Sequence, residues 1–331
     1  MPHILRQSAP RGHFAGIDPW ADRAAYGAIA AVGVFAFWLS RTHPAWMPFW
    51  APWDFSPSFY LAATLSLVWY CRGLACLAPA ARPPLWRRAA FLAGLFLIYA
   101  VLQTRVEYWS QHMFFLNRLQ AIAMHELGPF LIALGWPWAT LKAGLPNFVR
   151  KACENRPVSA ALRALHQPLI AAGLFLAGFY LWLIPIVHFR AMIDHQLYAV
   201  MNWSMVLGGL LFWNLVLDPR PKPPAPASIA ARVALALGVM LPQMLLGAVI
   251  SFMPRDLYPY YNLCGRLFPA IDPITDQHIG GIISWVPSSM MSVVAVLLIL
   301  NFMRLHQEAR AEASDAKQGT QVHLAERAVS R

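Results

Sequence analysis

The chain has 331 residues, of which 58% are hydrophobic and only 12% are charged. Soluble domains carry about 25% charged residues, so this composition excludes a soluble globular protein and predicts that lipid covers much of the apolar surface. The formal net charge of +11 does not indicate nucleic acid as a partner, because no basic stripe alternates with stacking aromatic side chains. We therefore expect an all-α fold, a polytopic transmembrane helical bundle in a lipid bilayer.

Eight segments of the chain are long and apolar enough to cross a bilayer as helices. Such a helix needs about 20 mostly apolar residues, with a range of ~17–25. The fourth segment is the most polar of the eight, and a short connection from His188 to His195 separates the fifth from the sixth. The predicted spans are 24–40, 58–78, 88–104, 114–135, 167–187, 196–217, 229–253 and 280–303.

These spans divide the chain into three regions. Residues 1–23 form a polar, basic N-terminal segment without the apolar centre of a cleavable signal peptide. Residues 24–304 form the transmembrane domain. Residues 305–331 are charged and rich in alanine, and we expect them to extend the last helix as a cytoplasmic tail that frays into disorder.

The positive charges predict how the bundle is oriented. With eight spans, 20 of the 26 Lys and Arg residues lie on one side of the membrane and five on the other, with Arg118 inside a span. Cytoplasmic connections carry an excess of Lys and Arg. We therefore expect both termini in the cytoplasm of a bacterial plasma (inner) membrane.

The fourth span carries ionisable side chains inside the membrane, where a charge is energetically unfavourable. Gln111, Arg118 and His125 are spaced by seven residues and share one helix face, and Glu126 adjoins that face. Charged groups within a membrane point into the bundle or toward a cavity. The sequence leaves two interpretations open, a structural polar network and a proton or solute path.

A second group of candidate residues joins the fifth and sixth spans on the predicted outer side. If this connection is helical, His188, Met192 and His195 lie at i, i+4 and i+7 and form one stripe. Imidazole and thioether ligands together suit Cu(I), and Asp194 is placed to orient an imidazole. Interfacial histidines are also common as hydrogen-bonded anchors, so this interpretation stays open beside the metal site.

The last outer loop carries a third polar group just before the eighth span, with Asp276 and His278. A carboxylate at that position suits the positive N-terminal end of a helix. We assign Arg118, Glu126, Asp194, Asp276 and His278 to a supporting polar network. No P-loop, G-x-S-x-G, H-E-x-x-H or dinucleotide-binding pattern is present in the sequence, and we expect no enzymatic activity.

Several motifs, in this order and spacing, resemble the CtaG family of assembly factors for caa-type cytochrome c oxidases over about residues 50–304. They are Asn117-Arg-Leu-Gln followed by Met-His125-Glu-Leu-Gly-Pro-Phe-Leu, Trp182-Leu-Ile-Pro-Ile-Val-His188, Met201-Asn-Trp-Ser-Met-Val, Leu210-Leu-Phe-Trp213, Leu217-Asp-Pro-Arg220, Leu241-Pro-Gln-Met-Leu-Leu-Gly247, Asp256-Leu-Tyr-Pro-Tyr-Tyr261, and Asp276-Gln-His-Ile-Gly-Gly followed by Trp285-Val-Pro. The resemblance implies a plasma-membrane protein that helps to mature a haem-copper oxidase, with copper handled on the outer side.

The sequence departs from this family in the fourth span. Relatives carry additional histidines near the positions of Asn117, Ala121 and Glu126, whereas this chain has only His125 there. The departure favours the outer residues over the fourth span as the main metal site.

The leading hypothesis is therefore an assembly factor that relays Cu(I) through His188, Met192 and His195, with His125 as a deeper ligand. Its partners would be oxidase subunits or other assembly factors. A second hypothesis is a copper or small-solute transporter with Arg118 and Glu126 along the path. A third is a haem-binding membrane cytochrome, because two helical histidines can ligate iron.

Overall fold

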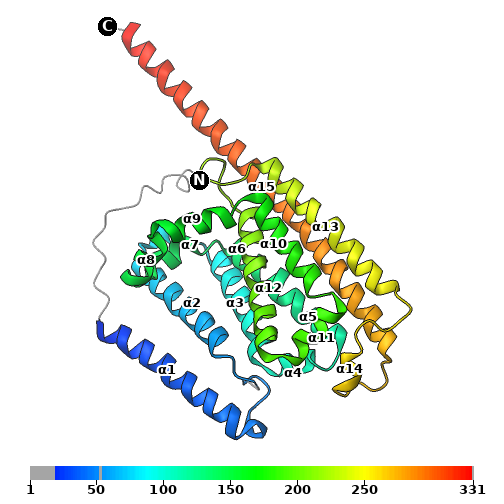
Figure 1. Cartoon of the computed structure of the whole chain (residues 1–331). Coiled ribbons are helices and arrows are strands. Elements are labelled where there is room, and N and C mark those ends of the chain that lie inside the picture. The colour runs from blue at the N-terminus through cyan, green and yellow to red at the C-terminus, as the bar shows by residue number, and fades with distance from the viewer. Residues whose placement is uncertain (1–18, 52–53, 330–331) are drawn as a thin grey trace.

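The computed structural model describes residues 19–51 and 54–329, and within these ranges all regular secondary structure is helical (Figure 1). The all-α prediction is confirmed. Most of the predicted N-terminal segment lies outside the described residues. The helices are α1 (Pro19–Thr42), η2 (Pro44–Trp46), α2 (Pro57–Cys76), η3 (Pro79–Ala81), α3 (Leu85–Gln103), α4 (Arg105–Ser110), α5 (Phe114–Ile122), η4 (Ala123–Leu127), α6 (Gly128–Gly135), α7 (Trp138–Gly144), α8 (Asn147–Glu154), α9 (Arg156–Leu165), α10 (Pro168–Leu181), α11 (Pro185–Ile193), α12 (His195–Val216), α13 (Ile229–Phe252), α14 (Tyr260–Leu263) and α15 (Pro273–Val329).

Each of the eight predicted spans falls on helix, but fewer helices meet the requirements of a span by themselves. In the described chain six are long and apolar enough, α1, α2, α3, α12, α13 and α15, and α9 with α10 makes a seventh if this pair, bent by 72°, is one span. The fourth predicted span is divided among α5, η4 and α6. A multi-pass membrane protein is therefore supported, while eight spans with both termini inside stay a prediction.

Two boundaries differ from the sequence prediction for local reasons. The fifth predicted span, 167–187, ends early because α10 stops at Leu181 and Pro185 begins the separate helix α11. Proline fits the first turn of a new helix but not the interior of a continuing one. At the other end of the chain, α15 runs from the eighth span through the predicted tail as one helix to Val329.

The fourth span is a helix interrupted by one π-helical turn. The chain continues from α5 through η4 into α6 without leaving a helical conformation, and the N–H of Gly128 donates to the carbonyl of Ala123, five residues back. Pro129 explains the wider turn. It has no N–H to give, and its ring would clash with the carbonyl of His125 in a regular α-helix. π-turns of this kind often mark functional sites.

Helix α12 lies at the centre of the bundle (Figure 1). Its apolar window is 61% buried, against 28% or less in each of the other five candidate spans. It packs against α6, η4, α10, α11 and α13. The second helix pair of the core is α13 with α15, and α15 also covers α5. The fourth span is therefore enclosed between α12, α15 and α3.

The short helices collect at two opposite ends of the bundle. In Figure 1, α4, α11 and α14 lie at one end, which we call the α11 end, and α8 and α9 lie toward the other, the α9 end. The α11 end holds the connections predicted to face outward. The α9 end holds basic connections, with Arg150, Lys151, Arg156 and Arg163 on α8 and α9.

Candidate functional site

A small cavity lies inside the bundle beside η4. It has room for about one water molecule at most. Five polar side chains line it, three from the fourth span and two from α15: Arg118, His125, Glu126, Ser284 and Ser288. The prediction that the ionisable face of the fourth span points into the bundle is confirmed for these residues, because Arg118, His125 and Glu126 are each at most 3% exposed.

The imidazole of His125 is held by stacking and leaves both ring nitrogens open. Its ring lies parallel to that of Phe175 with centroids 4.1 Å apart. Neither Nδ1 nor Nε2 has a hydrogen-bond partner among the described residues, and Nδ1 is 3.7 Å from the nearer carboxylate oxygen of Glu126. A buried polar group without a partner costs about 1–3 kcal/mol. The imidazole is thus positioned to take a ligand.

Only one of the two carboxylate oxygens of Glu126 has a hydrogen-bond partner among the described residues. Its Oε1 accepts a hydrogen bond of 2.6 Å from Nε2 of Gln243 on α13, and its Oε2 has no partner in the described part of the chain. The carboxylate next to His125 can therefore balance a positive charge in the cavity. Gln243 was not singled out from the sequence. A glutamine inside an otherwise apolar span is the signal that would have found it.

Arg118 lies at the α11 end of the same cavity. It donates to Oδ1 of Asn117, and its guanidinium is 5.3 Å from the ring centre of Phe114. Arg118 precedes His125 by seven positions, which is about 10 Å along the helix axis, and its guanidinium lies over Phe114, still nearer the α11 end. No carboxylate forms an ion pair with Arg118 within residues 19–51 and 54–329.

The predicted stripe of His188, Met192 and His195 is not formed. Helix α11 ends at Ile193, and Asp194 starts the new helix α12 by accepting hydrogen bonds from the N–H groups of Gln196 and Leu197. Asp194 is therefore an N-cap in this structure and not an acceptor for an imidazole. Because the helix is broken here, residues spaced at i, i+4 and i+7 do not lie on one helix face.

The two outer histidines have different surroundings. His188 is 1% exposed, and its Nδ1 and Nε2 are engaged by the carbonyl of Trp182 at 3.0 Å and the hydroxyl of Tyr261 at 2.9 Å. The side chain of His195 is 76% exposed and 3.9 Å from Asp54. Met192 is buried with its sulfur 3.9 Å from Nδ2 of Asn117. Copper ligation by this set stays a prediction. Both ring nitrogens of His188 already form hydrogen bonds within the protein.

His188 predicts a measurable pH dependence of stability. Burial first, and the charge of Arg118 second, lower the pKa of His188 to about 3. The unfolded chain takes up the proton near pH 6.5, so stability falls as the pH drops from 6.5 toward 3. Between pH 7 and pH 5 the loss is about 2 kcal/mol.

We expect the thermal midpoint in detergent to fall over this pH range in the unaltered protein and to fall less in His188→Gln. The partly exposed His166 provides the matched control, and His166→Gln should behave like the unaltered chain. An equal fall in all three proteins would contradict the assignment.

Asp276 and His278 organise the last outer loop. The carboxylate of Asp276 accepts from the N–H groups of Phe114 (3.0 Å) and Phe115 (2.8 Å) and pairs with Arg266 at 2.6 Å. It thus caps α5 from a different helix. Nε2 of His278 lies 3.3 Å from the carbonyl of Met253. Both residues belong to the predicted supporting network, and neither reaches the cavity lining.

A further polar group at the α11 end was missed from the sequence. Burial, with the charge of Asp54 second, raises the pKa of Glu107 well above its usual range. The hydroxyl of Tyr198 donates to Oε1 of Gln120 in the same region, and Oδ1 of Asn202 has no partner among the described residues. These side chains come from α4, α5 and α12, so only the packing brings them together.

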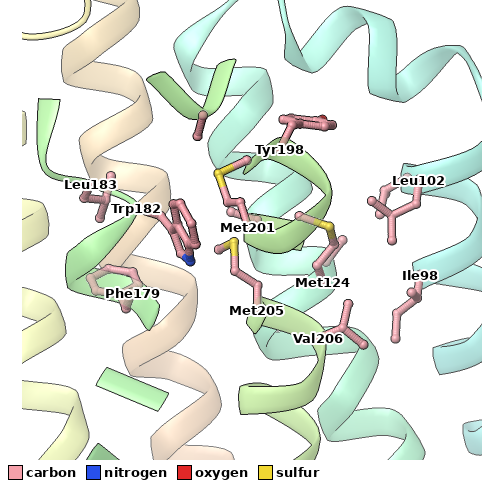
Figure 2. Packing of buried hydrophobic residues seen from close by; sticks show 14 of the residues in the cluster. Ile98, Leu102, Met124, Phe179, Trp182, Leu183, Tyr198, Met201, Met205 and Val206 are labelled. Atoms are coloured by element: carbon pink, nitrogen blue, oxygen red, sulfur yellow. The ribbon is translucent and has the colours of Figure 1, made fainter. Parts of the chain in front are cut away.

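No three His, Cys, Asp or Glu side chains come close enough to hold a metal ion in the described ranges. A site made only of those four residue types is therefore absent there. Thioether sulfur is the remaining soft ligand. Met205 lines the cavity beside His125, and it belongs to a buried cluster that holds further methionines. Figure 2 shows Met124, Met201 and Met205 together in the cluster that also holds Trp182 and Phe179.

The model of the cytochrome c oxidase caa3 assembly factor family matches residues 68–305. The chain belongs to this family. The match includes the fourth span, α12, α13 and the span part of α15, so every residue that lines the cavity lies inside the family region. The resemblance inferred from the motifs is confirmed.

Two similar proteins are known from mycobacteria. They are the uncharacterized proteins Mb0105 of Mycobacterium bovis and MT0111 of Mycobacterium tuberculosis, each 24% identical over 282 residues. The alignment covers 80% of this chain but 41% of each relative, so the chain spans about two fifths of the length of these proteins. No solved structure matches the chain.

Proposed function

We propose that this caa3 assembly factor family member is a non-enzymatic helper in the maturation of a haem-copper cytochrome c oxidase in the bacterial plasma membrane. The observation that carries the proposal is the family match over residues 68–305. That region is the packed helical core. Several of its buried polar side chains bind other elements of the bundle. Asp276 accepts a hydrogen bond from the start of α5, and Gln243 donates one to Glu126.

Copper is the cargo that we propose for this helper. A haem-copper oxidase needs copper inserted during assembly, and a helper that delivers it needs ligands that exchange readily. Imidazole and thioether are such ligands for Cu(I). The exposed His195 at the α11 end offers a first contact, and Met192 is a buried thioether on α11. The oxidase subunits and other assembly factors would meet the protein at this end.

The test is deletion of the gene in its own organism. We expect cytochrome c oxidase activity of isolated membranes to fall at least tenfold, to return with a plasmid copy, and to return in part when copper is added to the medium. Unchanged oxidase activity in the deletion strain would overturn the assembly role. Recovery with the plasmid but none with added copper would overturn copper as the cargo.

A further inference from the structure

We infer that His125 and Met205 form a buried Cu(I) site at the π-turn, and that the thioethers of Met201 and Met124 extend it through the core. This inference rests on the proposed function and deepens it, because it moves the site for the cargo from the outer connection to the centre of the bundle. It uses residues from η4 and α12 that are about 80 positions apart in the chain.

The packing of α12 on η4 brings these residues together. Met201, Met205 and Gly208 are spaced by four and three residues and share one face of α12. That face meets His125, since a Cβ on Gly208 would lie 3.9 Å from Nε2 of His125. Met205 and His125 also line the same cavity. The open Nε2 is therefore directed at the methionine-bearing face.

The donor set selects a soft monovalent metal. It consists of one imidazole with no hydrogen-bond partner in the described chain, a neighbouring carboxylate oxygen that is also open, and thioether sulfur. Zn²⁺ favours several imidazole, thiolate or carboxylate ligands, and Ca²⁺ and Mg²⁺ favour oxygen. Imidazole with thioether suits Cu(I). A water molecule would satisfy the imidazole but would give no reason for the sulfur atoms.

The charges around the cavity fit one positive charge beside His125. The carboxylate of Glu126 lies 3.7 Å from Nδ1 of His125. The guanidinium of Arg118 is directed away, over the ring of Phe114, and the two residues are separated by about 10 Å along the helix. A monovalent cation at His125 would thus adjoin the carboxylate of Glu126, and Arg118 would line the same cavity from its α11 end.

The methionines give the metal a way to move by ligand exchange. Met192, Met201, Met205 and Met124 belong to one buried cluster. Figure 2 shows the last three of these methionines. Met192 lies on α11, and Met201 lies closer than Met205 to the start of α12 at that end. Copper would pass between sulfur ligands and then to the imidazole, and it would remain Cu(I) at every step.

The test measures Cu(I) binding to the purified full chain in detergent, under anaerobic reducing conditions, against a chromophoric Cu(I) chelator. We expect the unaltered protein to hold about one Cu(I) and both Met205→Leu and His125→Phe to lose at least tenfold in affinity. The phenylalanine keeps the stacking on Phe175, and leucine conserves the volume of methionine. Met290→Leu is the matched control, since Met290 is 64% exposed on α15, and it should bind normally.

A second measurement is independent of any variant. X-ray absorption of the Cu(I)-loaded unaltered protein should show both nitrogen and sulfur neighbours. An unaltered protein that holds no Cu(I), a spectrum without sulfur, or unchanged affinity in Met205→Leu and His125→Phe would each overturn the site. If the chain binds no Cu(I) while a plasmid copy still restores oxidase activity in the deletion strain, this site is wrong and the assembly role stands.

Discussion

Replacing Gly209 by alanine is expected to destabilise the protein by about 3 kcal/mol or more. A Cβ at this position would lie 2.2 Å from the carbonyl oxygen of His125 and 2.8 Å from the ring of Pro129. The first of these is a backbone atom of η4, so a side-chain rotation cannot relieve the contact. Either α12 or the π-turn has to move, and the cavity beside His125 would change with it.

The neighbouring Gly208 provides a matched control for this prediction. A Cβ there has its nearest neighbour at 3.8 Å, which is an ordinary contact. Gly208→Ala should therefore be neutral or stabilising by up to about 1 kcal/mol, from the higher helix propensity of alanine. The measurement is the thermal midpoint of both variants in the same detergent. Equal midpoints would show that α12 does not approach η4 as closely as described.

The second large effect is expected for Asp276→Ala, which should lower the stability by about 3 kcal/mol. The substitution removes the acceptor for the N–H groups of Phe114 and Phe115 at the start of α5 and leaves Arg266 without its ion pair. The carboxylate is 1% exposed, and the arginine side chain is 13% exposed. Water therefore cannot replace the lost interactions fully.

Asp272→Ala is the control for the loss of a carboxylate in this loop. Asp272 accepts from the N–H groups of Ile274 and Thr275, but it is exposed to water, so its loss should destabilise the protein much less than the loss of Asp276. Chemical or thermal unfolding in detergent separates the two variants. If Asp276→Ala lowers the stability no more than Asp272→Ala does, Asp276 does not cap α5 as described.

The helices and their order could be predicted because lipid imposes long apolar segments on the sequence. The burial of Arg118, His125 and Glu126 followed from the cost of charge in a membrane. The break before α12 could not be predicted from spacing. It depends on Asp194, whose side chain can either cap a helix or bind elsewhere, and only the structure shows that it caps.

The methionines show why the candidate site was only partly predicted. Sequence reasoning gave weight to Met192, because it stands between two histidines on a presumed helix. Met205 has no such neighbours in sequence. It lines the same cavity as His125 because Gly209 lets α12 approach η4, and the π-turn beside that cavity follows from Pro129. Contacts between elements this far apart in the chain are set by packing, which local spacing does not encode.

We propose that the chain promotes oxidase maturation through the cavity at the π-turn. The most direct measurement is the copper content per cytochrome c oxidase purified from a deletion strain carrying each variant at equal membrane abundance. We expect a normal copper content of the oxidase with the unaltered chain and with Met290→Leu, and at least a tenfold loss of copper with His125→Phe. Fully loaded oxidase in the presence of His125→Phe would contradict it.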